Sequence, residues 1–182
     1  VKDVTAKMMR QEGDELPVSA IPDDGTWPTA TTQFEKRNIA VNIPSWNNAT
    51  CIQCLKCSTV CPHAAIRAKV VDEAALAGAP EGFKSADGKP PFKGKKFTLQ
   101  IAVEDCTGCG VCVETCPAKE KALVMRPLEE QMPQQKNWEY ITRHIGYKQV
   151  VDKTKSVKNL QFAQPLFEFS GACAGCGETP YI

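Results

Sequence analysis

The 182-residue sequence has no long apolar run. Polar, charged, Pro or Gly residues interrupt every stretch well before the roughly 20 apolar residues that a membrane-spanning helix needs. The opening stretch VKDVTAKMMR also lacks the apolar centre of a signal peptide. We therefore predict no membrane partner and a cytoplasmic location.

An excess of one charge is missing as well. The 22 Lys and Arg residues nearly balance the 21 Asp and Glu residues, and the formal net charge is +1. A general binder of nucleic acid or of anionic membranes needs a strongly basic field. The composition thus excludes both classes, and we predict no nucleic-acid partner.

Familiar catalytic groupings are absent too. The sequence shows no Ser/His/Asp set, no paired carboxylates and no Gly-rich phosphate loop, and it contains only two His. We therefore assign no catalytic residue within this chain.

Cysteine is abundant. The ten Cys form three tight groups, at 51, 54, 57 and 61, at 106, 109, 112 and 116, and at 173 and 176. A secreted disulfide scaffold spreads its cysteines to join distant segments, so this clustering favours a metal centre over disulfides.

The first two groups are copies of one motif. Each reads C-x2-C-x2-C-x3-C-P, and each Cys of the first group recurs 55 residues later, as Cys51 does in Cys106. An alternating apolar stretch precedes each motif, at 39–43 and at 97–103, and predicts a strand. The chain therefore contains a duplicated unit in which a strand leads into a loop of thiols.

This spacing is typical of 4Fe-4S clusters, in which the fourth Cys of each run binds the other cluster. Two structural zinc sites could use the same eight thiols, but the repeated x3 spacing that ends in Pro argues against them. The predicted ligands are Cys51, Cys54, Cys57 and Cys116 for the first cluster, and Cys61, Cys106, Cys109 and Cys112 for the second.

Residues 46–62 and 104–117 resemble a bacterial two-cluster ferredoxin, which implies an α+β fold. The Gly-, Pro- and Lys-rich segment 78–96 between the motifs is expected to be an exposed loop. It is interpreted either as a solvated excursion or as a docking patch for an acidic partner, through Lys93, Lys95 and Lys96.

The flanking residues complete a predicted division into four parts. Residues 1–37 form an extended lead-in with a short helix through Val4, Met8 and Met9, and 38–128 the two-cluster domain. Residues 129–164 form a connecting helix and linker, with Trp138, Ile141 and Ile145 on the buried face, and 165–182 begin a further domain.

Cys173 and Cys176 have no further Cys to complete a ligand set. A redox-active C-x-x-C pair would need its own βαβ fold, whereas PLFEFS at 165–170 reads as the first strand of an α/β unit that stops at Ile182. Since the chain also begins with Val1, we expect a piece of a longer protein.

The stretch FSGACAGCGETPY resembles the start of the thiamine diphosphate domain in the pyruvate:ferredoxin oxidoreductase family. GDELPVSA at 13–20, DGTWPT at 24–29 and residues 34–70 are similar to the same family. The resemblance implies that Cys173 and Cys176 are half of a third 4Fe-4S site. It also implies that Glu178 lies near thiamine diphosphate, although a helix-capping carboxylate is the alternative.

That family's reaction is the oxidative decarboxylation of pyruvate with CoA to acetyl-CoA and CO2, with electrons passed to ferredoxin or flavodoxin. The resemblance implies thiamine diphosphate with Mg, the rest of a longer chain and a homodimer. This segment would conduct electrons and not turn over pyruvate alone. The alternatives are a self-standing ferredoxin-type carrier and a related 2-oxoacid:ferredoxin oxidoreductase or one with another acceptor.

Overall fold

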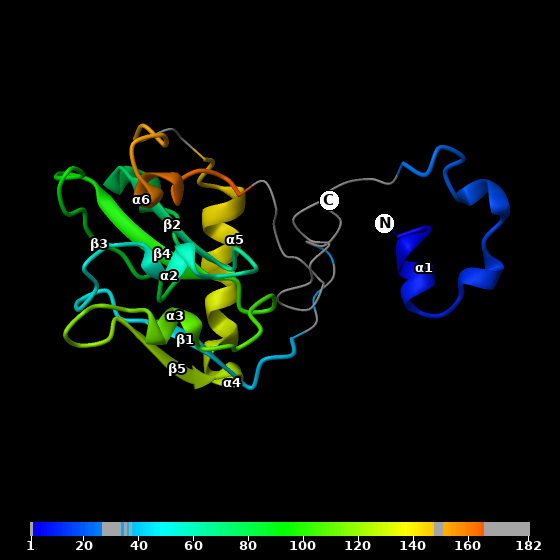
Figure 1. Cartoon of the computed structure of the whole chain (residues 1–182), viewed down its shortest axis with the longest axis horizontal. Helices are drawn as coiled ribbons and strands as arrows, with labels where there is room; N and C mark the ends of the chain where they lie inside the picture. The colour runs from blue at the N-terminus through cyan, green and yellow to red at the C-terminus, as the bar shows by residue number, and fades with distance from the viewer. Residues whose placement is uncertain (1, 27–33, 35, 37, 148–150, 166–182) are drawn as a thin grey trace. The chain divides into compact units, whose positions relative to one another are not determined.

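The computed structural model describes residues 2–26, 34, 36, 38–147 and 151–165 (Figure 1). Cys173, Cys176, Glu178 and almost all of the strand expected at 165–170 lie outside the described residues. The chain divides into two compact units, Val1–Glu35 and Lys36–Ile182. Within the described ranges, no helix has both the length and the apolar character needed to cross a membrane.

The N-terminal unit is built from short helical turns. The helix α1 (Thr5–Met9) is followed by the 3-10 turns Gly13–Glu15 and Val18–Ala20. Lys7 Nζ lies 3.2 Å from Glu15 Oε2, so an ion pair joins the helix to the first of these turns. None of residues 2–26 is buried, which means that this unit has little core of its own.

The second unit holds two antiparallel sheets joined by short helices, and the α+β prediction is confirmed. β1 (Asn42–Trp46) pairs with β5 (Leu123–Pro127), and Trp46 lies opposite Leu123. The other sheet has the order β2 (Ile66–Val71), β4 (Lys96–Ile101) and β3 (Ala86–Asp87).

The duplication is visible in the fold. β1, α2 (Lys56–Thr59) and β2 form the first copy, and β4, α3 (Val111–Glu114) and β5 the second, with α3 placed 55 residues after α2. β1 pairs with β5 and β2 with β4, so each sheet takes one strand from each copy. The two copies are interleaved, and this brings their cysteine loops together.

The two predicted strands differ in accuracy. β4 closely matches the strand predicted at 97–103, whereas β1 begins three residues later than the one predicted at 39–43. The side chains of Ile39 and Val41 are apolar but exposed, while that of Ile43 is buried. The apolar alternation therefore starts before the strand does. Pro44 is tolerated in β1 because a two-stranded sheet consists of edge strands.

Helices complete the core. After α4 (Leu128–Gln131), α5 (Gln135–Arg143) packs against the three-stranded sheet (Figure 1). Its predicted apolar face is confirmed, because Trp138, Ile141 and the following Ile145 are buried with Ala65, Val71 and Ala102. α6 (Val157–Leu160) is followed by Phe162, whose ring lies 5.2 Å from that of Phe92.

Segment 78–96 is exposed along much of its length but is more structured than the sequence predicts. It contains β3 and the buried Phe92. Two of the three lysines of the suggested docking patch are engaged within the chain. Lys95 pairs with Asp72 at 2.7 Å, and Lys96 with Asp87 at 2.9 Å. These contacts argue against the docking patch and against a freely solvated excursion.

Candidate metal centre

The two cysteine loops share an unusual backbone. The second residue after the first Cys is left-handed in both copies, at Gln53 (φ 59°) and Gly108 (φ 73°). So is the residue before each helix, at Leu55 (φ 62°) and Gly110 (φ 77°). These turns curl each loop around its thiols.

The left-handed residues also direct backbone donors at sulfur. The N–H of Gln53 lies 3.4 Å from Cys51 Sγ, and that of Gly108 lies 3.4 Å from Cys106 Sγ. Hydrogen bonds to the sulfur ligands of iron-sulfur clusters are one of the means by which a protein tunes their potential. The repeated geometry is thus suited to binding charged sulfur.

The structure brings the first predicted ligand set together. Cys51, Cys54 and Cys57 line one pocket with Cys116, which comes from the other copy of the motif. The same pocket is walled by Trp46, Leu55, Leu99 and Leu123, all of them buried. An apolar wall of this kind limits the access of water to a bound group.

The second predicted set is also close together. Burial is the main cause that raises the pKa of Cys106 to about 11; the N–H of Gly108 opposes this shift, and the neighbouring thiols of Cys61 and Cys109 contribute to it. Burial likewise raises the pKa of Cys112 to about 12, with contributions from Cys106, Cys61 and Cys109. Cys61 itself has a raised pKa, mainly from burial and to a smaller extent from Cys109. Each of these four thiols therefore interacts electrostatically with the other three.

The two sets approach each other at their most central thiols. Burial raises the pKa of Cys57 to about 12, with additional effects from Cys51, Cys54 and also Cys112, its counterpart 55 residues later. Cys57 lies in α2 and Cys61 follows two residues after its end, but the two thiols fall in different sets. One helical turn therefore links the two candidate centres.

The described cysteines form neither a disulfide nor a site for a single metal ion. All eight described cysteines are free. Among the described residues, no three or more His, Cys, Asp or Glu side chains are placed to hold a single metal ion. Tetrahedral zinc needs its thiolates within about 2.3 Å of one ion. A cube of irons and sulfides is wider than one ion, so its four thiolates lie farther apart than those of a zinc site.

The donor set therefore fits two iron-sulfur clusters. The buried thiols would stay protonated at neutral pH without a metal, since their pKa values are raised. Binding of iron supplies positive charge and displaces these protons. The N–H donors and the apolar wall supply the remaining stabilisation of the sulfurs.

Sequence reasoning missed an ion pair beside the second set. Asp105, next to Cys106, lies 2.5 Å from Lys36 Nζ, and its side chain is 5% exposed. Burial raises the pKa of Asp105, while the charges of Lys36, Arg67 and His63 oppose that shift. The 55-residue offset could have singled out this position, because the first copy has the neutral Thr50 there.

Sequence reasoning also missed Gln53. Its side chain is almost fully buried and bonds to segment 78–96, with Nε2 donating to Asp87 O at 2.8 Å and Oε1 accepting from the Lys89 N–H at 2.8 Å. The signal was again the offset, since a glutamine stands where the second copy has Gly108.

Comparisons with known families agree with the two-cluster interpretation. Residues 50–120 match a family described as a 4Fe-4S dicluster domain. Residues 1–40 match the EKR family, described as a domain of unknown function.

Curated relatives extend the similarity to the whole chain. Pyruvate-flavodoxin oxidoreductase of Trichormus variabilis is 51% identical over 187 residues, which cover 98% of this chain and 16% of the relative. Pyruvate:ferredoxin oxidoreductase of Moorella thermoacetica is 54% identical over 173 residues, 94% of this chain and 15% of the relative. A mitochondrial pyruvate dehydrogenase (NADP(+)) of Euglena gracilis is 47% identical over 183 residues, 100% of this chain and 10% of the relative.

The chain thus spans about one sixth of the length of the first two of these relatives. The resemblance to the pyruvate:ferredoxin oxidoreductase family is confirmed: along its whole length, the chain is similar to a segment of the pyruvate-flavodoxin and pyruvate:ferredoxin oxidoreductases.

Proposed function

We propose that this chain binds two 4Fe-4S clusters and conducts single electrons between them. The first cluster takes Cys51, Cys54, Cys57 and Cys116 as ligands, and the second takes Cys61, Cys106, Cys109 and Cys112. When bound, such a cluster accepts and releases one electron. The chain's own contribution is to hold the two sets next to each other, to donate N–H groups to their sulfurs and to exclude water.

One observation supports this proposal most directly. Cys116 lies with Cys51, Cys54 and Cys57 around one pocket, although its own motif is the other one. Conversely, Cys61 interacts with Cys106, Cys109 and Cys112. Because each helical turn carries ligands of both sets, the two clusters would lie on the order of 10 Å apart, a short distance for electron transfer.

We further propose that the chain is a segment of an enzyme that oxidatively decarboxylates pyruvate with CoA to acetyl-CoA and CO2. The names of the similar proteins support this activity, with ferredoxin or flavodoxin as acceptor. In that enzyme Cys173 and Cys176 would ligate part of a third 4Fe-4S cluster, and Glu178 would lie near thiamine diphosphate and Mg. A homodimer in the cytoplasm, where thiols stay reduced, completes the proposal.

The second candidate differs only in the acceptor. A relative from Euglena gracilis is named for NADP(+) and is 47% identical over the whole of this chain. The same two-cluster segment could therefore serve an enzyme whose electrons end on a nicotinamide. A self-standing carrier is disfavoured, because the similar proteins are several times longer than this chain.

The crossed ligand sets can be tested with two double variants of the native protein that carries this chain, purified anaerobically. Cys57→Ser/Cys116→Ser changes two ligands of one proposed cluster, so it should alter one cluster in the spin count of the reduced protein. Cys112→Ser/Cys116→Ser changes one ligand of each, so it should alter two. Thr115→Ser, next to Cys116, is the control and should alter none.

The reverse pattern, in which the first double variant alters two clusters and the second alters one, would show that each motif supplies its own four ligands. Zinc in place of iron in the unaltered protein would contradict the electron-transfer role itself.

A further inference from the structure

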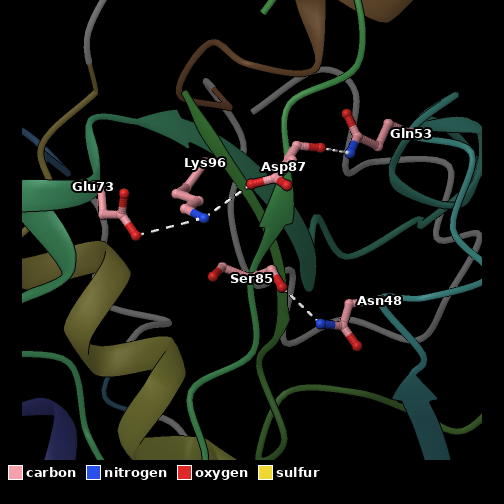
Figure 2. Close-up of polar contacts among 6 residues, drawn as sticks. All are labelled: Asn48, Gln53, Glu73, Ser85, Asp87 and Lys96. Carbon is pink, nitrogen blue, oxygen red and sulfur yellow. Dashed lines mark hydrogen bonds and ion pairs between the residues drawn. The ribbon is translucent and has the colours of Figure 1, made fainter. Parts of the chain in front are cut away.

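Segment 78–96 lies against the first cysteine loop. Asn48 Nδ2 donates to Ser85 O at 2.6 Å, and Gln53 Nε2 donates to Asp87 O at 2.8 Å (Figure 2). Lys89 adds two further bonds, from its N–H to Gln53 Oε1 at 2.8 Å and from its Nζ to Cys51 O at 3.1 Å. Residues 85–89 therefore form a cover, anchored on the residues that carry the first thiols.

The cover is held from its other side by the sheet. β3 pairs with β4, with Ala86 opposite Phe97 and Asp87 opposite Lys96. Lys96 Nζ reaches Asp87 at 2.9 Å and Glu73 at 3.5 Å (Figure 2). Since the sheet side is fixed in this way, the bonds to the cysteine loop decide whether the cover closes on that loop.

Gln53 occupies the central place among these bonds. Its side-chain amide donates to the carbonyl of Asp87 and accepts from the N–H of Lys89. It thus bonds to the backbone in the way that a neighbouring strand would. Its side chain has only 2% exposure, so loss of this amide would leave buried backbone groups without partners. Gln53 also has a left-handed backbone, which costs free energy for any residue with a Cβ.

A residue that served only to form the turn would be glycine, as Gly108 is in the second copy. At Gly108 a side chain has no room, because a Cβ would lie 2.7 Å from Asn42 O. At the equivalent position in the first copy, the residue is Gln53, whose left-handed backbone is strained and whose side chain ends in an amide. The side chain must therefore contribute something that the turn alone does not need.

We propose that Gln53 is a positioning residue for the first cluster: its side-chain amide clamps residues 85–89 over the loop that carries Cys51 and Cys54. The clamp holds the Gln53 N–H toward Cys51 Sγ and shields that side of the cluster from water and solutes. This proposal depends on the proposed ligation of the first cluster, and it assigns to segment 78–96 a protective role in place of partner docking.

Two variants of the iron-loaded native protein test the clamp. Gln53→Gly removes the amide while relieving the backbone strain, so a loss of protection cannot be attributed to a strained turn. Gln53→Glu keeps the acceptor for the Lys89 N–H and loses the donor to Asp87 O. Gln100→Leu is the matched control. Gln100 is a buried amide in β4 that bonds to Thr98 Oγ1 at 2.8 Å and to Lys84 O at 3.3 Å, so this variant removes an amide from the sheet side of the segment and keeps the bonds of Gln53.

The first measurement is hydrogen exchange at the Lys89 amide. Because that amide bonds to Gln53 Oε1, Gln53→Gly should speed its exchange by about tenfold or more. Gln53→Glu should change the exchange less, and Gln100→Leu should leave it unchanged. Unchanged exchange in Gln53→Gly would overturn the clamp.

The second measurement is the rate at which a ferrous chelator removes iron. In Gln53→Gly, one cluster's share of the iron should leave about tenfold faster, and the rest at the original rate. That share is assigned to the first cluster if it is missing in Cys57→Ser/Cys116→Ser. Iron loss within twofold of the unaltered protein, with faster Lys89 exchange, would overturn the shielding role.

A protein purified without iron would contradict the proposed function, while the Lys89 exchange would still test the clamp.

Discussion

The two cysteine loops have the same backbone and different surroundings. In the first loop, the left-handed positions carry Gln53 and Leu55, which are buried, and residues 85–89 cover the loop. In the second loop, glycines occupy these positions, Ala40 and Asn42 pack against Gly108, and Cys109 is exposed. A duplicated motif thus fixes where the thiols lie, while side chains at equivalent positions determine how each loop is covered.

The largest expected effect comes from the first loop. Leu55 has 2% exposure and belongs to the core around the thiols, whereas its counterpart Gly110 has open space where a Cβ would be. Leu55→Ala should lower the free energy of unfolding by about 4 kcal/mol, because it leaves a cavity in the core. Anaerobic denaturant unfolding measures this change. A loss below about 1 kcal/mol would show that the loop collapses onto the cavity.

The second loop should not tolerate a side chain at Gly108, although the first loop carries one at the equivalent position, Gln53. At Gly108, an added Cβ would meet Asn42 O at 2.7 Å and Ala40 Cβ at 3.2 Å, and the backbone is left-handed. Gly108→Ala should therefore cost about 3 kcal/mol in the same unfolding measurement. Gly110→Ala, which adds only backbone strain, is the matched control and should cost about 1 kcal/mol. Equal losses in the two variants would contradict the close packing of Gly108.

A charge difference between the copies should have the smallest of these effects. Thr50 in the first copy corresponds to Asp105 in the second, and Asp105 is nearly buried and paired with Lys36. Lys36→Met should lower the free energy of unfolding by about 2 kcal/mol, since it leaves a buried carboxylate without its nearest cation. Lys36→Arg keeps the charge and should cost less. Equal losses for Met and Arg would show that packing, and not charge, is what Lys36 supplies.

The sequence predictions are accurate for features that depend on residues close together in the chain, and less accurate for features that depend on distant contacts. The buried face of α5 was predicted correctly, because Trp138, Ile141 and Ile145 recur at helical spacing. The start of β1 was wrong by three residues, because Ile39 and Val41 are apolar but exposed. Segment 78–96 looked like a free loop, since nothing in its own composition shows that Gln53 and Asn48 bind it.

By itself, the sequence determined the duplication, the positions of the ten thiols and the kind of centre they suit, because ligand spacing is a local property of the chain. Only the tertiary structure decided which residues cover each loop, how Asp105 is paired and that Gln53 reaches segment 78–96. These contacts join residues about 34 to 69 positions apart, and sequence spacing carries no information about which such pairs meet.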